Sequence, residues 1–302
     1  MTTLSEKKII LITGSSHGIG RFTAETLARE GHTVYATMRG IDRRNAPARA
    51  ALTGLAETEG LDLRVLELDV TDDASVAAAV AAVLARSGRI DVVVNNAGTM
   101  FVGVTEAYTL EKARQQMETN FFGALRVNRA VLPHMRARGD GLLVHVTSLA
   151  GRIVFPFFGI YSASKFALEA LAEAFRYELS PFGVDSVIVE PGPFGTNLIA
   201  SVHPSDDHVR LKEYGDVAQI PPNMLSSFDR FLSSDDAPDA REVAGAVRDL
   251  VATPKGERPL RTVVGIDYGV RALNEAVAPT QQGLLEALEM TALATPASPA
   301  VG

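Results

Sequence analysis

Short runs of consecutive apolar residues alternate along this chain with longer segments in which apolar residues recur at helical spacing. Continuous apolar runs are typical of strands that are buried on both faces of a parallel sheet. The strands predicted in this way cover residues 7–13, 33–37, 63–68, 90–94, 142–147, 184–189 and 260–265.

Amphipathic helices are predicted between these strands. The first follows a glycine-rich turn and ends at Gly31, a residue that favours a left-handed C-cap. Thr71 is expected to N-cap the helix after the third strand, with Asp72 and Asp73 complementing its dipole. Other helices are predicted at 110–138, 161–179 and 240–251. The alternation predicts an α/β fold, a doubly wound parallel sheet (Rossmann-like) in a three-layer α/β/α arrangement.

The chain of 302 residues is interpreted as a single domain, because no repeat or change of composition occurs before residue 193. The segment from about 193 to 240 contains several prolines and two Asp-Asp pairs, yet it keeps many apolar side chains. A linker would not need those side chains, so this segment is interpreted as a substrate lid with short helices. Residues from about 291 to 302 are expected to form a frayed tail.

Composition narrows the classes of protein further. The chain is 46% hydrophobic, and its 29 Lys and Arg against 36 Asp and Glu give a net charge of −7. A mildly acidic chain without a basic block is a poor candidate for nucleic-acid binding. It contains no cysteine, and no apolar run approaches the roughly 18 residues of a membrane helix. We therefore expect a cytoplasmic protein with no nucleic acid, metal or membrane partner.

A glycine-rich turn follows the first strand and spans residues 13–20. Gly14 would permit a tight turn, and Gly18 would let backbone N–H groups approach a pyrophosphate. Gly20 would let the following helix pack close to the strand. Three glycines also occur in ordinary strand-to-helix turns. Because strand, turn and helix lie where a dinucleotide needs them, we favour a nucleotide site.

The end of the second strand indicates which dinucleotide is bound. An Asp or Glu there would bind the 2′-hydroxyl of NAD, but the strand ends in Thr37, Met38 and Arg39. The Arg39 guanidinium would match a 2′-phosphate in charge and geometry. The alternative is a solvated loop charge, like Arg43 and Arg44. The missing carboxylate favours NADP(H) over NAD(H).

Tyr161 and Lys165 lie four residues apart, on one face of a predicted helix. A phenol with a pKa of about 10 is a weak acid–base catalyst at neutral pH, and a nearby ammonium would lower that pKa. Ser148 follows the fifth strand and residues 95–98 follow the fourth. Because such strand ends meet at the ligand crevice, we expect these groups to lie together. The alternatives are an exposed amphipathic pair and ordinary turn residues.

In this order, the motifs resemble those of the short-chain dehydrogenase/reductase family over about residues 7 to 200. The matching motifs are 13–20, Asp69, 95–98, Asn120, Ser148, Tyr161 with Lys165, and 191–196. Residues 34–39 and the long segment after Gly192 resemble the NADP-preferring hydroxysteroid and retinol dehydrogenase-like branch. His17 is a departure, since many NADP-using relatives carry Arg or Lys there.

The resemblance implies a catalytic set of Asn120, Ser148, Tyr161 and Lys165. Tyr161 would exchange a proton with the substrate oxygen, and Ser148 would hydrogen-bond that oxygen. Lys165 would hold the nicotinamide ribose and lower the pKa of Tyr161, while Asn120 would hold a water in a relay to Lys165. Asp69 would bind the adenine. The expected cofactor-binding residues are Thr13, Gly14, Ser15, Ser16, Gly18, Ile19, Gly20, Arg39, Asp69, Val70, Asn96, Ala97, Gly98, Tyr161, Lys165, Pro191, Gly192 and Thr196.

The leading hypothesis is an NADP(H)-dependent carbonyl reductase or alcohol dehydrogenase. A nucleotide-sugar epimerase or dehydratase would use the same Tyr and Lys, but it would need a larger C-terminal domain than the residues after Gly192 provide. A non-catalytic NADP-binding sensor would tolerate loss of the catalytic residues, and all four are present. The resemblance also implies a homodimer or homotetramer.

Three apolar stretches are expected to wall the substrate site, and Arg152 is the one evident anion partner near them. They predict a bulky, largely apolar ketone, aldehyde or alcohol of steroid, retinoid or lipid-like character. The stretches are residues 99–102, residues 153–158, and the lid residues Phe194, Leu198 and Ile199.

Several histidines are interpreted without assigning them chemistry. His145 lies inside the fifth strand and is expected to be a hydrogen-bonded core residue. A metal site is the alternative for four polar residues in the lid, but a solvated loop is the favoured interpretation. These four are His203, Asp206, Asp207 and His208.

Overall fold

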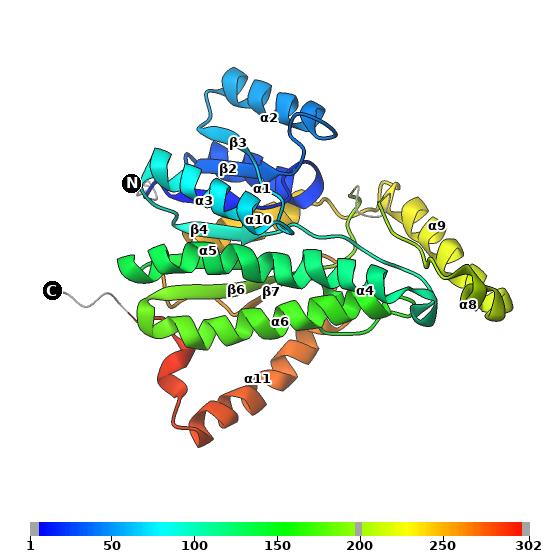
Figure 1. The fold of residues 1–302 in the computed structure, drawn as a ribbon. Helices are drawn as coiled ribbons and strands as arrows, with labels where there is room; N and C mark the ends of the chain where they lie inside the picture. Colours follow the sequence, from blue (N-terminus) through cyan, green and yellow to red (C-terminus); the bar gives the residue numbers. More distant parts are fainter. Residues whose placement is uncertain (1–5, 197–200, 298–302) are drawn as a thin grey trace.

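A computed structural model describes residues 6–196 and 201–297, and its core is a seven-stranded parallel sheet (Figure 1). The strands follow the order β3-β2-β1-β4-β5-β6-β7 across the sheet. Their bounds are β1 (Ile9–Ile12), β2 (Thr33–Met38), β3 (Leu63–Glu67), β4 (Val92–Asn95), β5 (Gly141–Val146), β6 (Val184–Pro191) and β7 (Arg261–Val264).

Each strand sends alternate side chains to opposite faces of the sheet, so a hydrophobic core lies on each face. In β1, Ile10 and Ile12 belong to one core, and Ile9 and Leu11 belong to the other. Helices α1 (Gly18–Arg29), α2 (Ala46–Glu59) and α10 (Arg241–Ala252) cover the first core. Helices α3 (Asp73–Ser87), α5 (Gly123–Arg138) and α6 (Gly159–Leu179) cover the second. The predicted three-layer α/β/α fold is confirmed.

The strand order reverses at the pair β1 and β4. From β1 the chain winds outward through β2 and β3, and then returns to place β4 on the other side of β1. In doubly wound sheets, ligands bind at the carboxyl ends of the strands around such a switch point. The loops after β1, β4, β5 and β6 therefore approach one edge of the sheet.

Two helical regions differ from the prediction. The long helix expected over 110–138 is divided into α4 (Leu110–Met117), a π-helical turn (Glu118–Phe122) and α5. The N-cap of α3 is Asp72 and not Thr71, because the Asp72 carboxylate accepts hydrogen bonds from the N–H groups of Ala74 and Ser75. The Thr71 hydroxyl instead donates to Asp69.

The C-terminal part is more regular than expected. Helix α11 (Val270–Ala287), like α2, is not among the predicted elements, and a 3-10 turn (Thr291–Ala294) follows it. The carbonyl of Ala294 accepts from Arg176, and the N–H of Ala297 donates to Ser180. The expected frayed tail therefore does not begin at 291; residues 298–302 lie outside the described part.

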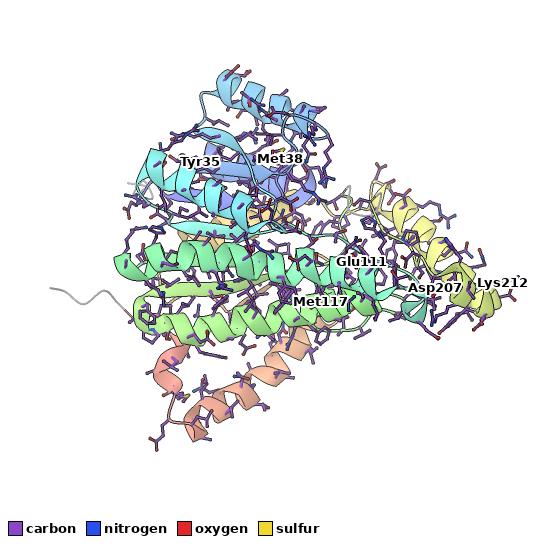
Figure 2. The ribbon with its side chains drawn as sticks, viewed as in Figure 1. Tyr35, Met38, Glu111, Met117, Asp207 and Lys212 are labelled. Atoms are coloured by element: carbon purple, nitrogen blue, oxygen red, sulfur yellow. The ribbon has the colours of Figure 1, made fainter. Side chains whose placement is uncertain are left out.

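The segment predicted as a lid contains α8 (His208–Glu213), a 3-10 turn (Gly215–Gln219) and α9 (Ile220–Leu232). Figures 1 and 2 show α8 and α9 projecting from one end of the sheet, with Asp207 and Lys212 at their outer end. Leu198 and Ile199 lie outside the described residues. Across residues 6–196 and 201–297, no helix is both long and apolar enough to span a bilayer.

Residues after that gap run alongside the loop that follows β4. His203 donates its N–H to the carbonyl of Met100 (3.0 Å) and accepts from the N–H of Val102 (3.3 Å), beside an isolated parallel bridge to Phe101. The N–H of Asp206 donates to the carbonyl of Ala107 (3.1 Å). The chain that leads into α8 is therefore hydrogen-bonded to the loop after β4.

Candidate active site

The turn after β1 packs against the loop after β4 so closely that side chains are excluded. Gly14 has a φ of +70°, and a Cβ there would lie 2.7 Å from Cα of Ala97. A Cβ on Gly20 would lie 2.3 Å from Nδ2 of Asn96, which donates to the carbonyls of Thr13 and Gly14. Glycine is required at both positions, and it leaves the turn as bare main chain.

Two of the residues expected to bind the cofactor, Thr13 and Ser15, hold this turn together. Thr13 Oγ1 accepts from the N–H groups of Asn96 (3.1 Å) and Ala97 (3.0 Å). Ser15 is fully buried, its hydroxyl donating to the carbonyl of Ile12 and its N–H to that of Thr37. Thr13 and Ser15 therefore lie behind the turn and shape it.

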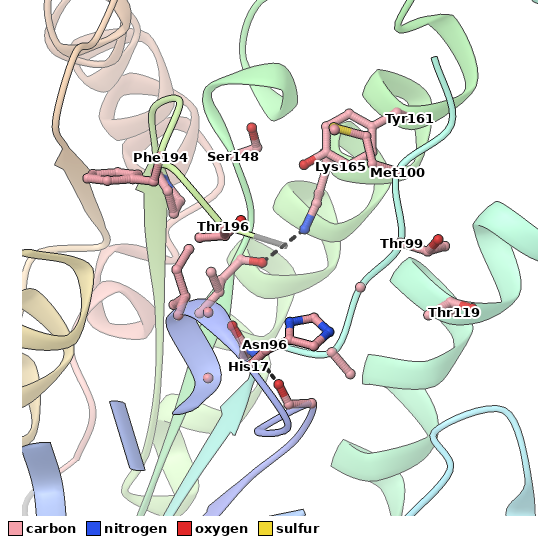
Figure 3. Close-up of a pocket in the computed structure, with 18 of the residues that line it drawn as sticks. His17, Asn96, Thr99, Met100, Thr119, Ser148, Tyr161, Lys165, Phe194 and Thr196 are labelled. Carbon is pink, nitrogen blue, oxygen red and sulfur yellow. Dashed lines mark hydrogen bonds between the residues drawn. The ribbon is translucent and has the colours of Figure 1, made fainter. Parts of the chain in front are cut away.

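A cavity runs along the carboxyl ends of the strands and contains most of the predicted site residues (Figure 3). Thr13, Ser15 and Asn120 are the exceptions. The predicted residues that line the cavity are Gly14, Ser16, Gly18, Ile19, Gly20, Arg39, Asp69, Val70, Asn96, Ala97, Gly98, Ser148, Tyr161, Lys165, Pro191, Gly192 and Thr196.

Ser148, Tyr161 and Lys165 face one part of this cavity (Figure 3). Tyr161 and Lys165 lie one turn apart on α6 and are both buried. Lys165 Nζ donates to the carbonyl of Val146 (3.1 Å) and lies 5.8 Å from the centroid of the Tyr161 ring. Ser148 follows β5 and N-caps a 3-10 turn (Leu149–Gly151). The structure thus brings together three of the four predicted catalytic side chains at the cavity wall.

Burial dominates the proton affinity of this pair. It raises the pKa of Tyr161 to about 12, against a hydrogen bond with Ser148 that lowers it. It also lowers the pKa of Lys165 to about 8, against the charge of Glu169. Burial therefore outweighs the hydrogen bond with Ser148 in setting the pKa of Tyr161, and the lowering expected from Lys165 stays a prediction.

Asn120 lies in the π-helical turn, a type of turn that occurs often at functional sites. Its Oδ1 accepts from the N–H of Thr99, and its Nδ2 donates to the carbonyl of Thr99 and to Ser164 Oγ. A Cβ on Gly98 would lie 3.5 Å from this Oδ1 and 3.9 Å from Lys165 Nζ. Asn120 is therefore near Lys165, with its amide joined to neighbouring residues, and its water relay stays a prediction.

The end of the cavity near Asp69, away from Tyr161, carries positive charge. Arg39 lines it, half-exposed, with Nη1 3.8 Å from Oδ2 of Asp69. Arg44, which the sequence analysis treats as a solvated charge, also lines it, as does Asn45. Burial lowers the pKa of His17 below its ordinary value, so at neutral pH this ring supplies little charge. The cations facing this end are thus the two arginines.

The end of the cavity around Tyr161 is lined by apolar side chains. Some of the residues predicted to line it lie elsewhere. Phe101 is buried away from the cavity, between Tyr108 and His203, and Val154 is exposed. Arg152 does not line the cavity, because its Nε donates to Asn274 (2.8 Å). The apolar lining consists mainly of Met100, Phe155, Phe158, Phe194, Leu225, Phe228 and Leu232.

Tyr268, in the loop after β7, also lines the cavity, although it is not among the residues expected from the sequence. Its ring lies edge-on to Phe155, with centroids 5.7 Å apart. Phe155 contacts Phe158 at 5.8 Å, and Phe158 contacts Tyr161 at 6.1 Å. The rings of Tyr268, Phe155, Phe158 and Tyr161 therefore form a row of successive contacts along the cavity wall. Nothing local in the sequence around Tyr268 distinguishes it from an ordinary loop tyrosine.

His145, Asp206 and Asp207 lie outside the cavity. His145 is fully buried without a hydrogen-bond partner in the described part of the chain, so the predicted hydrogen-bonded histidine is wrong. Burial lowers its pKa to about 3. Asp206 accepts from Thr109, and Asp207 N-caps α8. These two carboxylates anchor the lid segment.

Residues 8–207 match the family model described as short chain dehydrogenase. The chain belongs to the short-chain dehydrogenase/reductase family. A 3-ketodihydrosphingosine reductase from Bacteroides thetaiotaomicron is 34% identical over 261 residues, covering 86% of this chain and 88% of that protein. Human retinol dehydrogenase 8 is 34% identical over 272 residues, covering 86% and 82% respectively. These relatives agree with the branch that the sequence resembles.

Solved structures of this oxidoreductase family superpose well on the fold. A short-chain dehydrogenase from Streptomyces avermitilis gives a TM-score of 0.75 at 34% identity, covering 94% of this chain and 98% of that one. An alcohol dehydrogenase from Thermococcus sibiricus complexed with 5-hydroxy-NADP gives 0.68 at 28% identity, covering 86% and 96%.

Proposed function

We propose that this protein is an NADP(H)-dependent oxidoreductase that interconverts a carbonyl and an alcohol on a bulky, largely apolar substrate. The observation that carries the proposal is that Ser148, Tyr161 and Lys165 face the same cavity as the glycine turn. The relatives that reduce 3-ketodihydrosphingosine or oxidise retinol, by their names, support a substrate of this kind.

The residues at the glycine turn fit a dinucleotide. Gly14 and Gly20 leave no room for a Cβ on their inner side, so main chain forms this wall of the cavity. The N-terminus of α1 begins at Gly18, where free N–H groups and the helix dipole favour a phosphate. When bound, the nicotinamide supplies or accepts the hydride.

The arginines at the end of the cavity near Asp69 support the choice of NADP(H) as cofactor. Arg39 and Arg44 both face the part of the cavity beyond the glycine turn, near Asp69. A guanidinium binds a phosphate through paired, charge-assisted hydrogen bonds, whereas a carboxylate would be needed to select the 2′-hydroxyl.

Tyr161 is the group suited to move the proton. Because burial raises its pKa to about 12, Tyr161 holds its proton at neutral pH and can donate it to an alkoxide oxygen. Ser148 can hydrogen-bond the same oxygen. The positive charge of Lys165, beside the Tyr161 ring, stabilises the phenolate that remains after transfer. In the oxidative direction the proton of the alcohol passes to Tyr161 in its phenolate form, which the charge of Lys165 stabilises.

The lining beyond Tyr161 supports a neutral, apolar substrate. Its polar side chains include the uncharged hydroxyls of Thr99, Ser148, Tyr161 and Tyr268, and Arg152 is bonded elsewhere. The segment 193–240 contributes Phe194, Leu225, Phe228 and Leu232, which supports its role as the substrate lid. Burial of apolar area contributes about 25 cal/mol per Å², so affinity should rise with hydrocarbon size.

The test is to follow the absorbance of NADPH while the protein reduces a series of ketones graded by alkyl length. We expect kcat/KM to rise with each added methylene until the cavity is filled. Matched assays with NADH, and with alcohols and NADP⁺, give the cofactor preference and the direction. A kcat/KM that stays flat or falls with alkyl length would contradict the apolar pocket. The absence of turnover with any carbonyl or alcohol would contradict the proposed function.

A further inference from the structure

A group of charged side chains is buried behind the active site and has no part in the proposed reaction. Glu190 is fully buried near the end of β6, next to Pro191 at the cavity wall. Its Oε2 accepts from Asn274 Nδ2 on α11 (2.6 Å). Its Oε1 lies 3.5 Å from Nε of Arg261 and 4.0 Å from Nε of Arg152.

Two further carboxyl groups, both on α6, share Arg261 with Glu190. Glu169 Oε2 accepts from Arg261 Nε (3.0 Å), and Glu173 Oε2 accepts from Arg261 Nη2 (2.5 Å). Oε1 of Glu169 and Oε1 of Glu190 are buried without a hydrogen-bond partner in the described part of the chain. Three carboxyl groups thus face two guanidinium groups, so these five groups carry a net charge of −1 when all are ionised.

The cluster contacts the elements that carry the catalytic side chains. Arg152 directly follows the 3-10 turn that Ser148 caps, and its Nε donates to Asn274 Oδ1. A Cβ on Gly151, in that turn, would lie 2.9 Å from Cγ of Glu169 and 3.1 Å from the carbonyl oxygen of Lys165. The turn therefore rests on α6 at the level of Lys165, while the charges themselves lie outside the cavity lining.

We propose that Glu190 is a positioning residue for the reaction proposed above: its ionised carboxyl, with Arg152 and Asn274, holds the turn bearing Ser148 in place against α6. Of the carboxylates in the described part of the chain, Glu190 is the one that forms an ion pair with Arg152. Protonation of Glu190 removes that partner, and the turn then loses its charged link to β6 and α11.

The surroundings explain why this carboxyl titrates near neutral pH. Burial and the charge of Glu169 raise the pKa of Glu190 to about 7, although the hydrogen bond from Asn274 and the charges of Arg261 and Arg152 lower it. Burial also raises the pKa of Glu169 above its ordinary value. The groups that act on Glu190 are Arg152 after β5, Glu169 on α6, Arg261 on β7 and Asn274 on α11. Glu173 on α6 is linked to the cluster through Arg261, and Tyr177 donates to Glu173.

The first test compares Glu190→Gln with Glu173→Gln. Both substitutions remove a carboxylate near Arg261, but only the first removes the partner of Arg152. Because a displacement of about 1 Å can cost up to about a hundredfold in rate, we expect Glu190→Gln to lower kcat by roughly ten- to a hundredfold. The KM for NADPH should stay within about twofold, because the glycine turn is not touched.

The pH profile separates positioning from a loss of structure. In the wild type, kcat should rise through a pKa near 7 as Glu190 ionises, and Glu190→Gln should lack that rise. Glu173→Gln should keep both the rate and the rise. A wild-type rate and profile in Glu190→Gln, or an equal loss in Glu173→Gln, would overturn the proposal.

Amide hydrogen exchange tests the same proposal without any turnover, so it also separates this proposal from the proposed function. Exchange over residues 148–153 should be faster in Glu190→Gln than in the wild type, and unchanged in Glu173→Gln. If Glu190→Gln does not fold, Asn274→Ala removes the neutral link and keeps every charge. It should speed exchange over 148–153 to a smaller extent, and unchanged exchange there would contradict the proposal.

The pH dependence of thermal unfolding measures how folding changes the affinity of Glu190 for its proton. The pKa of Glu190 rises from an ordinary 4.5 to about 7 on folding, so the folded protein binds this proton more tightly than the unfolded chain. Its contribution to stability is therefore present at low pH and is lost as pH rises through that interval. Glu190→Gln should lack this loss, so its Tm should fall less across the interval than that of the wild type. An identical fall in both proteins would show that Glu190 does not hold the proton.

Discussion

The two ends of the cavity are built in different ways. At the cofactor end, main chain forms the wall, and Gly14 and Gly20 fit because no Cβ can be placed there. At the substrate end, side chains such as Phe158, Phe228 and Tyr268 form the wall, and they come from segments far apart in the sequence. A main-chain wall depends on a few positions that allow no replacement. An apolar side-chain wall tolerates exchange of one side chain for another, so substrate choice can change there while the cofactor end stays the same.

Tyr161 lies between the cofactor end and the substrate end, and its substitution should have the largest effect on turnover. Tyr161→Phe removes the proton donor but keeps the ring that packs against Phe158. We expect turnover to fall by at least about a hundredfold, the scale of general acid–base catalysis. The Kd for NADPH, measured by fluorescence, should remain near that of the wild type. Near-normal turnover in a folded variant would contradict the assignment of Tyr161 as the proton donor.

The cofactor end should respond to a change of charge. Arg39→Asp replaces a guanidinium with a carboxylate beside Asp69, so we expect the KM for NADPH to rise by about ten- to a hundredfold. The KM for NADH should change much less, so the preference for NADPH is erased or reversed. Arg44→Ala is the companion variant and should weaken NADPH binding less. A wild type whose KM is lower for NADH than for NADPH would show that Arg39 is a loop charge.

The substrate end should show the smallest effect, and the effect should depend on substrate size. Phe228→Ala in α9 removes apolar contact area, so the KM for the longest ketones should rise by about fivefold. The KM values for a short ketone and for NADPH should not change. Phe182→Ala, at an exposed position outside the cavity, is the matched control. Equal effects on short and long ketones would mean that α9 does not select substrate.

The same contrast explains how much the sequence alone could predict. Strand, glycine turn and helix form a local motif, and the alternation of elements predicts the sheet, so the cofactor end can be found without a structure. The burial that raises the pKa of Tyr161 depends on residues distant in sequence and could not be predicted. Glu190 and Tyr268 reach their partners only when β6, β7 and α11 are assembled.

Smaller differences have local causes. Thr71 and Asp72 are adjacent N-cap candidates, and a shift of one residue in the helix start decides between them. Arg152 lies in sequence between Ser148 and the aromatic stretch that includes Phe155, which suggests a place in the pocket. Its guanidinium instead turns towards Glu190 and Asn274, a direction that sequence position does not specify.

The pairing of residues 201–207 with the loop after β4 has a consequence for the exchange of parts between relatives. Hydrogen bonds link Met100 and Val102 to His203, and Ala107 to Asp206. Neither segment keeps its backbone partners if the other is replaced by one of different length or register. Chimeras that aim to transfer substrate selectivity should therefore carry both segments from one parent. Crossover points placed between them should give poorly expressed proteins, whereas points outside both should give active hybrids.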